Sequence, residues 1–273
     1  MSKVMVVTSG KGGVGKTTSS AALGAALAQA GEKVVLVDFD VGLRNLDLIM
    51  GAERRVIFDL VNVVQGDAKL AQALIRDKRI ETLSLLPASQ TRDKDALTEE
   101  GVGRVIEELR EKFDWVVCDS PAGIEKGATL AMRFADLAVV VTNPEVSSVR
   151  DSDRIIGMLD SKTQRAENGE TLEKHLLLTR YDAARAARGE MMKVEDVLEI
   201  LAIPLLGIVS ESPDVLTASN FGCPITLHNP TSAAARAYSD AARRLMGEHI
   251  AVRTPSERRQ GLMSRLFGRK AVA

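Results

Sequence analysis

The sequence predicts an α/β domain with a doubly wound, mostly parallel sheet and helices on both faces. Short apolar runs, longer amphipathic segments between them and a length of 273 residues point to this fold class. The apolar runs are continuous rather than alternating, as in strands that are buried on both sides of a parallel sheet. Such strands are joined by right-handed crossover helices, which produces the doubly wound arrangement.

Strand and helix patterns alternate along most of the chain, and we take them in order. Strands are expected at residues 4–8, 34–38, 83–87, 115–119, 138–142, 175–179 and 205–209. Helices, whose apolar positions recur at three- and four-residue spacing, are expected at 16–30, 99–112, 147–159, 194–201 and 231–246. After the last helix the composition turns polar around Pro255, and proline cannot continue a helix. We therefore predict one domain over residues 1–250, a linker at 251–257 and a short tail at 258–273.

Composition excludes several classes of protein. The two cysteines, Cys118 and Cys223, are too few for a disulfide framework or a four-cysteine metal site. One Trp, two Tyr and six Phe are too few for a base-stacking platform. No apolar run approaches 18 residues, so no membrane-spanning helix is expected, and the first apolar run is too short for a secretory signal.

Charge is divided unevenly along the chain. Residues 253–273 hold six basic residues and one acidic residue, a net charge of +5. The whole chain carries −1, which leaves −6 for residues 1–252. An acidic body with a basic end is typical of a protein whose terminal segment binds a surface.

A phosphate-binding loop follows the first predicted strand and opens the first predicted helix. It matches G-x-x-x-x-G-K-[ST] at every position, in the order Gly10, Lys11, Gly12, Gly13, Val14, Gly15, Lys16 and Thr17. Glycines let backbone N–H groups surround phosphate oxygens, and the helix N-terminus adds its positive end. We expect Lys16 to contact the β- and γ-phosphates and Thr17 to bind Mg²⁺. The fold class is thus that of a P-loop NTPase.

Carboxylates stand at the ends of two other predicted strands, at the sheet edge where open α/β sheets bind ligands. Asp119 is expected to support the Mg²⁺ directly or through water, the alternative being a solvated strand end. Asp38 and Asp40 lie on the same side of the chain, because alternate residues of a strand share a face. One would support the waters of the metal and the other would orient the attacking water, unless both are structural.

The nucleotide is expected to be ATP. The tetrapeptide N-K-x-D, with which GTPases read guanine, does not occur in the sequence. Arg180 and Tyr181 follow a predicted strand at a suitable position for the edge of the adenine base, although they form no strong motif.

Lys11 is an additional cation that a general phosphate loop does not need. It could stabilise phosphate in its own site or reach the site of a partner. With the residues up to Thr18 it resembles the deviant Walker A motif of the MinD/ParA family of ATPases. The stretches 38–47, 88–95 and 145–153 are similar to the MinD branch of that family more than to ParA, and the similarity covers essentially the whole chain.

The resemblance implies specific roles. Lys11 would contact ATP across an ATP-dependent homodimer, Asp40 would position the hydrolytic water, and Asp38 and Asp119 would flank the Mg²⁺. Similarity to the MinD branch further implies a protein that helps to place the cell-division septum, recruits the division inhibitor MinC and is stimulated by MinE. Partners dock on the helix at 147–159, where Asp151 and Asp153 are the candidate contacts, with a solvated helix face as the alternative. The family resemblance also implies a cytoplasmic protein that is peripheral on the inner face of the cell membrane.

The tail has an amphipathic pattern. Its apolar residues recur at helical spacing and basic residues fill the other positions, as in a helix that lies on anionic lipid. The expected membrane contacts are Leu262, Met263, Leu266, Phe267, Arg265 and Arg269. One copy would bind only marginally, whereas two copies in a dimer gain about 10²- to 10⁴-fold in avidity. A frayed end, or a helix that packs back on the domain, are the alternatives.

Four other functions are alternatives for a chain with a phosphate loop. A ParA-type DNA-partitioning ATPase is the main alternative, but DNA binding gives no reason for an apolar face on the tail, so no specific nucleic acid is expected. An electron-transfer relative with an iron–sulfur cluster would need paired cysteines. A small-molecule kinase would need an arginine-rich lid, and a scaffold that binds ATP without hydrolysis would tolerate loss of Asp40.

Overall fold

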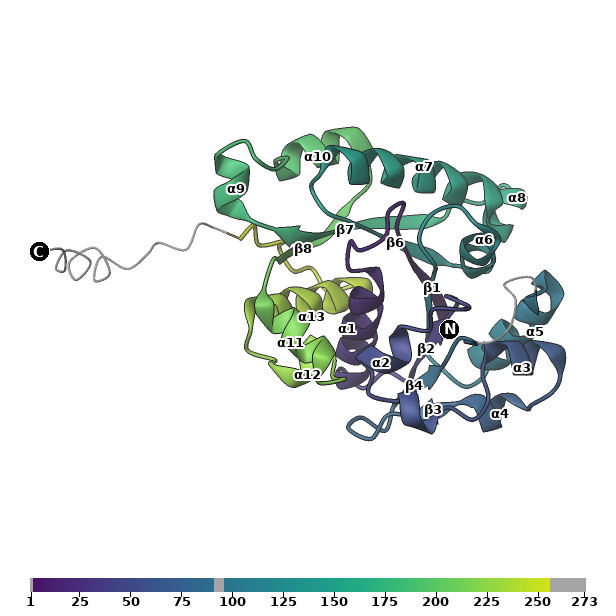
Figure 1. Ribbon diagram of the computed structural model, residues 1–273. Coiled ribbons are helices and arrows are strands. Elements are labelled where there is room, and N and C mark those ends of the chain that lie inside the picture. Colours follow the sequence, from purple (N-terminus) through teal and green to yellow (C-terminus); the bar gives the residue numbers. More distant parts are fainter. Residues whose placement is uncertain (1, 91–95, 256–273) are drawn as a thin grey trace, which may run out of the picture.

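An eight-stranded sheet forms the centre of the computed structural model, which describes residues 2–90 and 96–255 (Figure 1). The strand order is β3-β4-β2-β5-β1-β6-β7-β8, and every neighbouring pair is parallel except β3 and β4. The order reverses on the two sides of β1, as in a doubly wound sheet. The predicted fold class is confirmed.

The strands and helices have the following bounds. The strands are β1 Lys3–Thr8, β2 Val34–Asp38, β3 Ile75–Arg76, β4 Leu83–Leu86, β5 Trp115–Asp119, β6 Leu137–Thr142, β7 Glu173–Tyr181 and β8 Leu205–Ser210. The helices are α1 Lys16–Gln29, α2 Leu46–Ile49, the 3₁₀ helix η1 Glu53–Arg55, α3 Leu60–Gln65, α4 Leu70–Ala73, α5 Glu99–Arg110, α6 Lys126–Arg133, α7 Val146–Lys162, α8 Gln164–Glu167, α9 Ala183–Ala187, α10 Val194–Leu201, α11 Pro213–Asn220, α12 Ile225–His228 and α13 Ala233–Leu245.

All the strands and long helices expected from the sequence are present, with ends that differ by at most three residues. The strand missed is β3, which has two residues and runs antiparallel at one edge of the sheet. The missed helices are mostly short, and α6 and α11 are the longest of them, with eight residues each. Elements of this length are fixed by tertiary contacts rather than by a periodic apolar pattern.

Helices cover the two faces of the sheet and form two apolar cores (Figure 1). One core lies under α3, α5, α6, α7 and α10, and the other lies under α1, α2 and α11–α13. Helix α1 packs closely on the sheet because Gly24 presents no side chain there; a Cβ would lie 2.3 Å from Leu36 Cδ2. Side-chain caps begin several helices: Thr98 accepts a hydrogen bond from Gly101 N, and Ser232 accepts one from Ala235 N.

The carboxyl ends of β1, β2 and β5 meet at one edge of the sheet. These strands are neighbours, and their register places Asp38 opposite Asp119 and Asp119 opposite Val7. The loop after β1 therefore opens beside both acidic strand ends. This edge holds most of the side chains that the sequence singled out.

Residues 251–255 follow α13 and return to the sheet at β8, which is an edge strand. The predicted membrane contacts Leu262, Met263, Arg265, Leu266, Phe267 and Arg269 lie outside the described residues. Within residues 2–90 and 96–255, no helix is long and apolar enough to cross a membrane.

Candidate nucleotide site

The loop between β1 and α1 has the backbone form that a phosphate requires. Gly13 has a φ of +77° and Gly15, the residue before α1, has a φ of +91°. Residues with a side chain rarely adopt such values, so these glycines allow the turn. Because the first N–H groups of a helix have no partner within the helix, the start of α1 can bind phosphate oxygens.

Gly10 begins this loop at a contact with α7. A Cβ built on Gly10 would lie 2.2 Å from the carbonyl oxygen of Asp151, so any larger residue would collide with the helix backbone. The loop and the helix therefore touch backbone to backbone. Asp151 is half-buried beside this contact, whereas Asp153 is exposed and lies about 200° further around α7.

Asp119, at the end of β5, is 1% exposed and faces the loop. The Ser20 hydroxyl of α1 donates a hydrogen bond of 2.7 Å to Oδ1, while Oδ2 is buried with no hydrogen-bond partner among the described residues. Burial raises the pKa of Asp119, and the charge of Lys16, followed by the nearby hydroxyls of Ser20 and Thr17, acts in the opposite direction. A carboxylate oxygen that is buried without a partner is suited to a ligand.

Asp38, at the end of β2, is fully buried, and both of its carboxylate oxygens accept hydrogen bonds. Oδ1 accepts a hydrogen bond from Asp40 N at 2.9 Å, and Oδ2 accepts one from Leu46 N at 3.3 Å. Burial, with the neighbouring charge of Asp119, raises the pKa of Asp38 to about 8, and the two backbone hydrogen bonds lower it in part. Asp38 thus holds the loop from Asp40 to Leu46 through hydrogen bonds to both of its oxygens.

Asp40 lies at the start of that loop, and its charge raises the pKa of both Asp38 and Asp119. The three carboxylates are therefore close together. The loop turns back at Arg44, which has a φ of +48° and forms an ion pair of 2.7 Å with buried Asp47. This turn is irregular backbone that no apolar pattern in the sequence indicates.

The Lys11 side chain, 41% exposed, lies along the start of α7. Its Nζ donates a hydrogen bond of 2.9 Å to Ser147 Oγ and is 3.5 Å from Glu145 Oε2. In this conformation the Lys11 side chain contacts residues of its own chain at the start of α7.

A cavity of about 480 Å³ adjoins the loop between α1, β7, β8, α11 and α13. Arg180, with a φ of +53°, is among its lining residues. Tyr181 does not line it; this side chain is 7% exposed and packs in the apolar core under α10. Val14 and Thr18, which the sequence places in the loop, line the cavity as well. The opposite wall was not predicted: it is formed after β8 by residues that include Ser212, Pro213 and Leu216, and Tyr238 of α13 adds to it. The signal in the sequence that could have indicated this wall is the pair Ser212-Pro213, which follows a predicted strand.

The residues at this edge fit a magnesium ion. Mg²⁺ binds oxygen ligands and keeps several waters, so it needs only one or two protein groups beside the phosphates. The partnerless Asp119 Oδ2 and the hydroxyl of Thr17, on the first turn of α1, supply oxygens of this kind. No cluster of three or more His, Cys, Asp or Glu side chains suited to a metal occurs in the described part of the chain.

Comparisons with known proteins agree with this site. The family model of the CobQ/CobB/MinD/ParA nucleotide binding domain matches residues 5–225. Septum site-determining protein MinD of Escherichia coli K12 is 60% identical over 270 residues, which cover 98% of this chain and all of that protein. Among solved structures, the MinC:MinD cell division protein complex of Aquifex aeolicus has a TM-score of 0.84 at 42% identity, over 94% of this chain and 100% of that one.

A further structure, septum site-determining protein MinD of Pyrococcus horikoshii complexed with Mg-ADP, has a TM-score of 0.79 at 31% identity. The match covers 90% of this chain and 96% of that one. The family match at residues 5–225 spans the phosphate loop, both acidic strand ends and α7. The chain therefore belongs to the CobQ/CobB/MinD/ParA family of nucleotide-binding proteins, and within it to the septum site-determining MinD proteins.

Proposed function

We propose that this protein is an ATPase that binds Mg²⁺ and ATP at the carboxyl edge of its sheet, hydrolyses the nucleotide and uses the cycle to place the division septum. The observation that carries the proposal is the phosphate loop facing a buried carboxylate, Asp119, with one partnerless oxygen. The Pyrococcus relative, solved with Mg-ADP, supports both ligands. The adjoining cavity of about 480 Å³ is large enough for a nucleobase and ribose.

Each residue near the loop has a distinct task in this proposal. The loop amides from Gly10 to Thr18 surround the phosphates, and Lys16 neutralises their charge. Thr17 and Asp119 hold the Mg²⁺, which supplies charge stabilisation at the phosphates. Hydrolysis then depends on positioning, and the half-buried Asp40 is placed to orient the attacking water.

Asp38 acts mainly through the backbone in this scheme. Because its two oxygens accept the amides of Asp40 and Leu46, it holds the loop that carries Asp40. Arg180 is the base contact that its place in the cavity supports. Tyr181 supports the same strand from the core rather than contacting the base.

A homodimer formed over this edge would complete the site. Large apolar side chains stand exposed around it: Leu43, Ile124, Val146 and Leu216 are each at least 65% exposed. A surface of this kind commonly marks a contact with another protein. Lys11 lies on the same side at the start of α7, from where its side chain can turn toward the nucleotide of a second copy.

Partners and membrane complete the proposal. The Aquifex relative was solved as a complex with MinC, which supports MinC as a partner of this chain. MinC and MinE would meet the dimer at α7, where Asp153 is exposed and Asp151 adjoins the loop. The tail would hold the ATP-bound dimer on anionic lipid at the cytoplasmic face of the cell membrane, and hydrolysis would release it.

Co-sedimentation with anionic vesicles tests nucleotide switch and tail together. The parent should sediment in ATP but not in ADP, and Leu262→Glu should stay in solution. Gln260→Glu adds the same charge at a position off the apolar pattern and should still sediment. Equal sedimentation of Leu262→Glu and the parent would contradict the membrane role, and ATP-dependent retention on duplex DNA without vesicle binding would favour a ParA-type function.

A further inference from the structure

Arg244 of α13 holds the chain segment that precedes the tail. Its Nε donates a hydrogen bond of 2.7 Å to Ile250 O, and its Nη2 donates one of 2.8 Å to Ala251 O. The remaining terminal nitrogen, Nη1, donates one of 2.6 Å to Leu206 O of β8. One guanidinium thus joins α13, the edge strand of the sheet and the segment that leaves α13.

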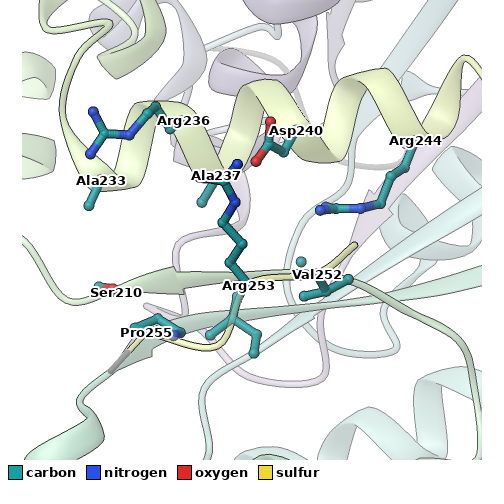
Figure 2. A pocket seen from close by; sticks show the side chains of 11 residues that line it. Ser210, Ala233, Arg236, Ala237, Asp240, Arg244, Val252, Arg253 and Pro255 are labelled. Atoms are coloured by element: carbon teal, nitrogen blue, oxygen red, sulfur yellow. The ribbon is translucent and has the colours of Figure 1, made fainter. Parts of the chain in front are cut away.

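Residues 250–255, which we call the C-terminal strap, are held by more than this side chain. Val252 packs against the apolar core, and Val252, Arg253 and Pro255 line a cavity of about 180 Å³ between the strap, β8 and α13. Figure 2 shows Arg244 and Asp240 pointing from α13 toward the strap, and Arg253 extending from the strap toward α13. The strap is therefore fixed on the domain up to Pro255, although its polar composition predicted a linker.

The elements that hold the strap also form the nucleotide cavity. Ser210 of β8 lines both cavities. Tyr238 of α13 lines the nucleotide cavity, and its hydroxyl lies 3.0 Å from Ser19 Oγ on α1. The segment that leads into residues 256–273 is thus held by the same strand, β8, and the same helix, α13, that line the nucleotide cavity.

We propose that Arg244 is a positioning residue that fixes the point at which residues 256–273 leave the domain. The proposal rests on the proposed membrane role of those residues. With the strap in place, two tails in a dimer start from fixed points and reach the membrane together. If the strap were released, six more residues would add a flexible segment of about 13 Å to each tail. A longer flexible connection lowers the effective concentration of the second tail.

The central variant is Arg244→Gln, with Arg243→Gln as its matched control. Arg243 is the adjacent residue on α13, and its guanidinium forms an exposed ion pair of 2.6 Å with Glu248. Two measurements are made on the full chain: the rate of trypsin cleavage after Arg253, and the concentration of anionic vesicles that half-saturates binding in ATP. Thermal melting and ATP binding verify that each variant is folded.

Arg244→Gln should speed cleavage after Arg253 by about 10-fold or more, because three hydrogen bonds no longer oppose local opening. It should raise the half-saturating vesicle concentration about 3- to 10-fold, whereas Arg243→Gln should change neither value. Arg244→Lys keeps the charge with fewer directed donors and should fall between Arg244→Gln and the parent.

Unchanged cleavage in Arg244→Gln would show that Arg244 does not hold the strap and would overturn the proposal. Faster cleavage with unchanged vesicle binding would overturn the positioning role. If the parent itself failed to bind vesicles, both the proposed membrane role and the positioning role of Arg244 would be contradicted. The cleavage rates would still show whether Arg244 holds the strap on the domain. If Arg244→Gln melted early, Arg244→Lys would supply the same comparison.

Discussion

A half-buried carboxylate at one end of the sheet and a fully buried one at the other differ in their partners. At the amino end, Asp136 before β6 accepts hydrogen bonds from Val4 N at 2.8 Å and Arg165 Nη2 at 3.2 Å, and Arg110 Nη1 lies 2.8 Å away. These partners outweigh the effect of burial and lower the pKa of Asp136. At the carboxyl end, Asp119 is more deeply buried, lacks an arginine partner among the described residues, and has a raised pKa.

Other polar atoms at the carboxyl end show the same pattern. Several buried oxygens there have no hydrogen-bond partner in the described part of the chain: Thr8 Oγ1, Ser89 Oγ, Asp119 Oδ2, Asn143 Oδ1 and Ser148 Oγ. Fewer such atoms lie at the amino end, where Ser2 Oγ and Arg110 Nε lack a hydrogen-bond partner. Unpaired buried polar groups reduce stability, so folding alone gives no reason for them. The comparison teaches that Asp136 at the amino end stabilises the fold through its partners, whereas Asp119 at the carboxyl end keeps one oxygen without a partner, in contrast to its neighbour Asp38, both of whose oxygens accept backbone hydrogen bonds.

The largest expected effect is that of Asp40→Ala on hydrolysis. Removing the carboxylate that orients the water should lower the ATPase rate about 100-fold or more, while nucleotide binding is kept. Phosphate release and equilibrium ATP binding are the measurements. A hydrolysis rate equal to that of the parent would show that Asp40 does not orient the water. Absence of phosphate release from both proteins would support a scaffold that binds ATP without hydrolysing it.

Asp136→Asn tests the other half of the comparison. Loss of the charge that pairs with Arg110 and Arg165 should lower the free energy of unfolding by about 2–3 kcal/mol at pH 7. A carboxylate whose folded pKa is lowered stabilises the protein above its unfolded pKa, about 3.9, and loses this contribution as pH falls through the folded value. Urea unfolding should thus show a constant difference from pH 5 to 8 that shrinks below about pH 4. ATP affinity of the folded variant should not change.

Asp119→Asn should give the reverse pattern. The Mg²⁺ concentration needed for nucleotide binding should rise about 10- to 100-fold. Unfolding in the absence of Mg²⁺ should lose less stability than in Asp136→Asn, because burial already disfavours the Asp119 charge. Titration of Mg²⁺ at fixed ATP, with urea unfolding in parallel, measures both. A stability loss larger than that of Asp136→Asn would contradict the division between the two ends.

The smallest effect is expected for Glu100→Gln on α5. Glu100 forms an ion pair of 2.9 Å with Arg104, but the two side chains are 85% and 64% exposed. Solvent and salt screen such pairs, so the free energy of unfolding should change by less than about 0.5 kcal/mol. Urea unfolding beside Asp136→Asn shows whether burial or mere pairing decides the contribution of a carboxylate.

Strand ends and the phosphate loop could be predicted from the sequence because their signals are local. A buried strand that delivers Asp38 or Asp119 is visible in a few adjacent residues, as is the loop at 10–17. Contacts between distant residues could not be predicted: Lys11 meets Glu145 134 residues away, and Arg244 holds Leu206 on another element. The Tyr181 side chain points into the core because it packs beneath α10, and the residues next to Tyr181 in the sequence do not indicate this packing.

The contact between Gly10 and the backbone of Asp151 has a mechanical consequence. With no side chain between them, the loop and α7 have nothing compressible at their junction, since a single methyl group would already overlap the Asp151 carbonyl oxygen. A displacement of α7 toward the loop, even by a fraction of an ångström, would have to be taken up by the loop backbone. A molecule that moved α7 toward the sheet would therefore meet the first peptide of the phosphate loop without an intervening side chain.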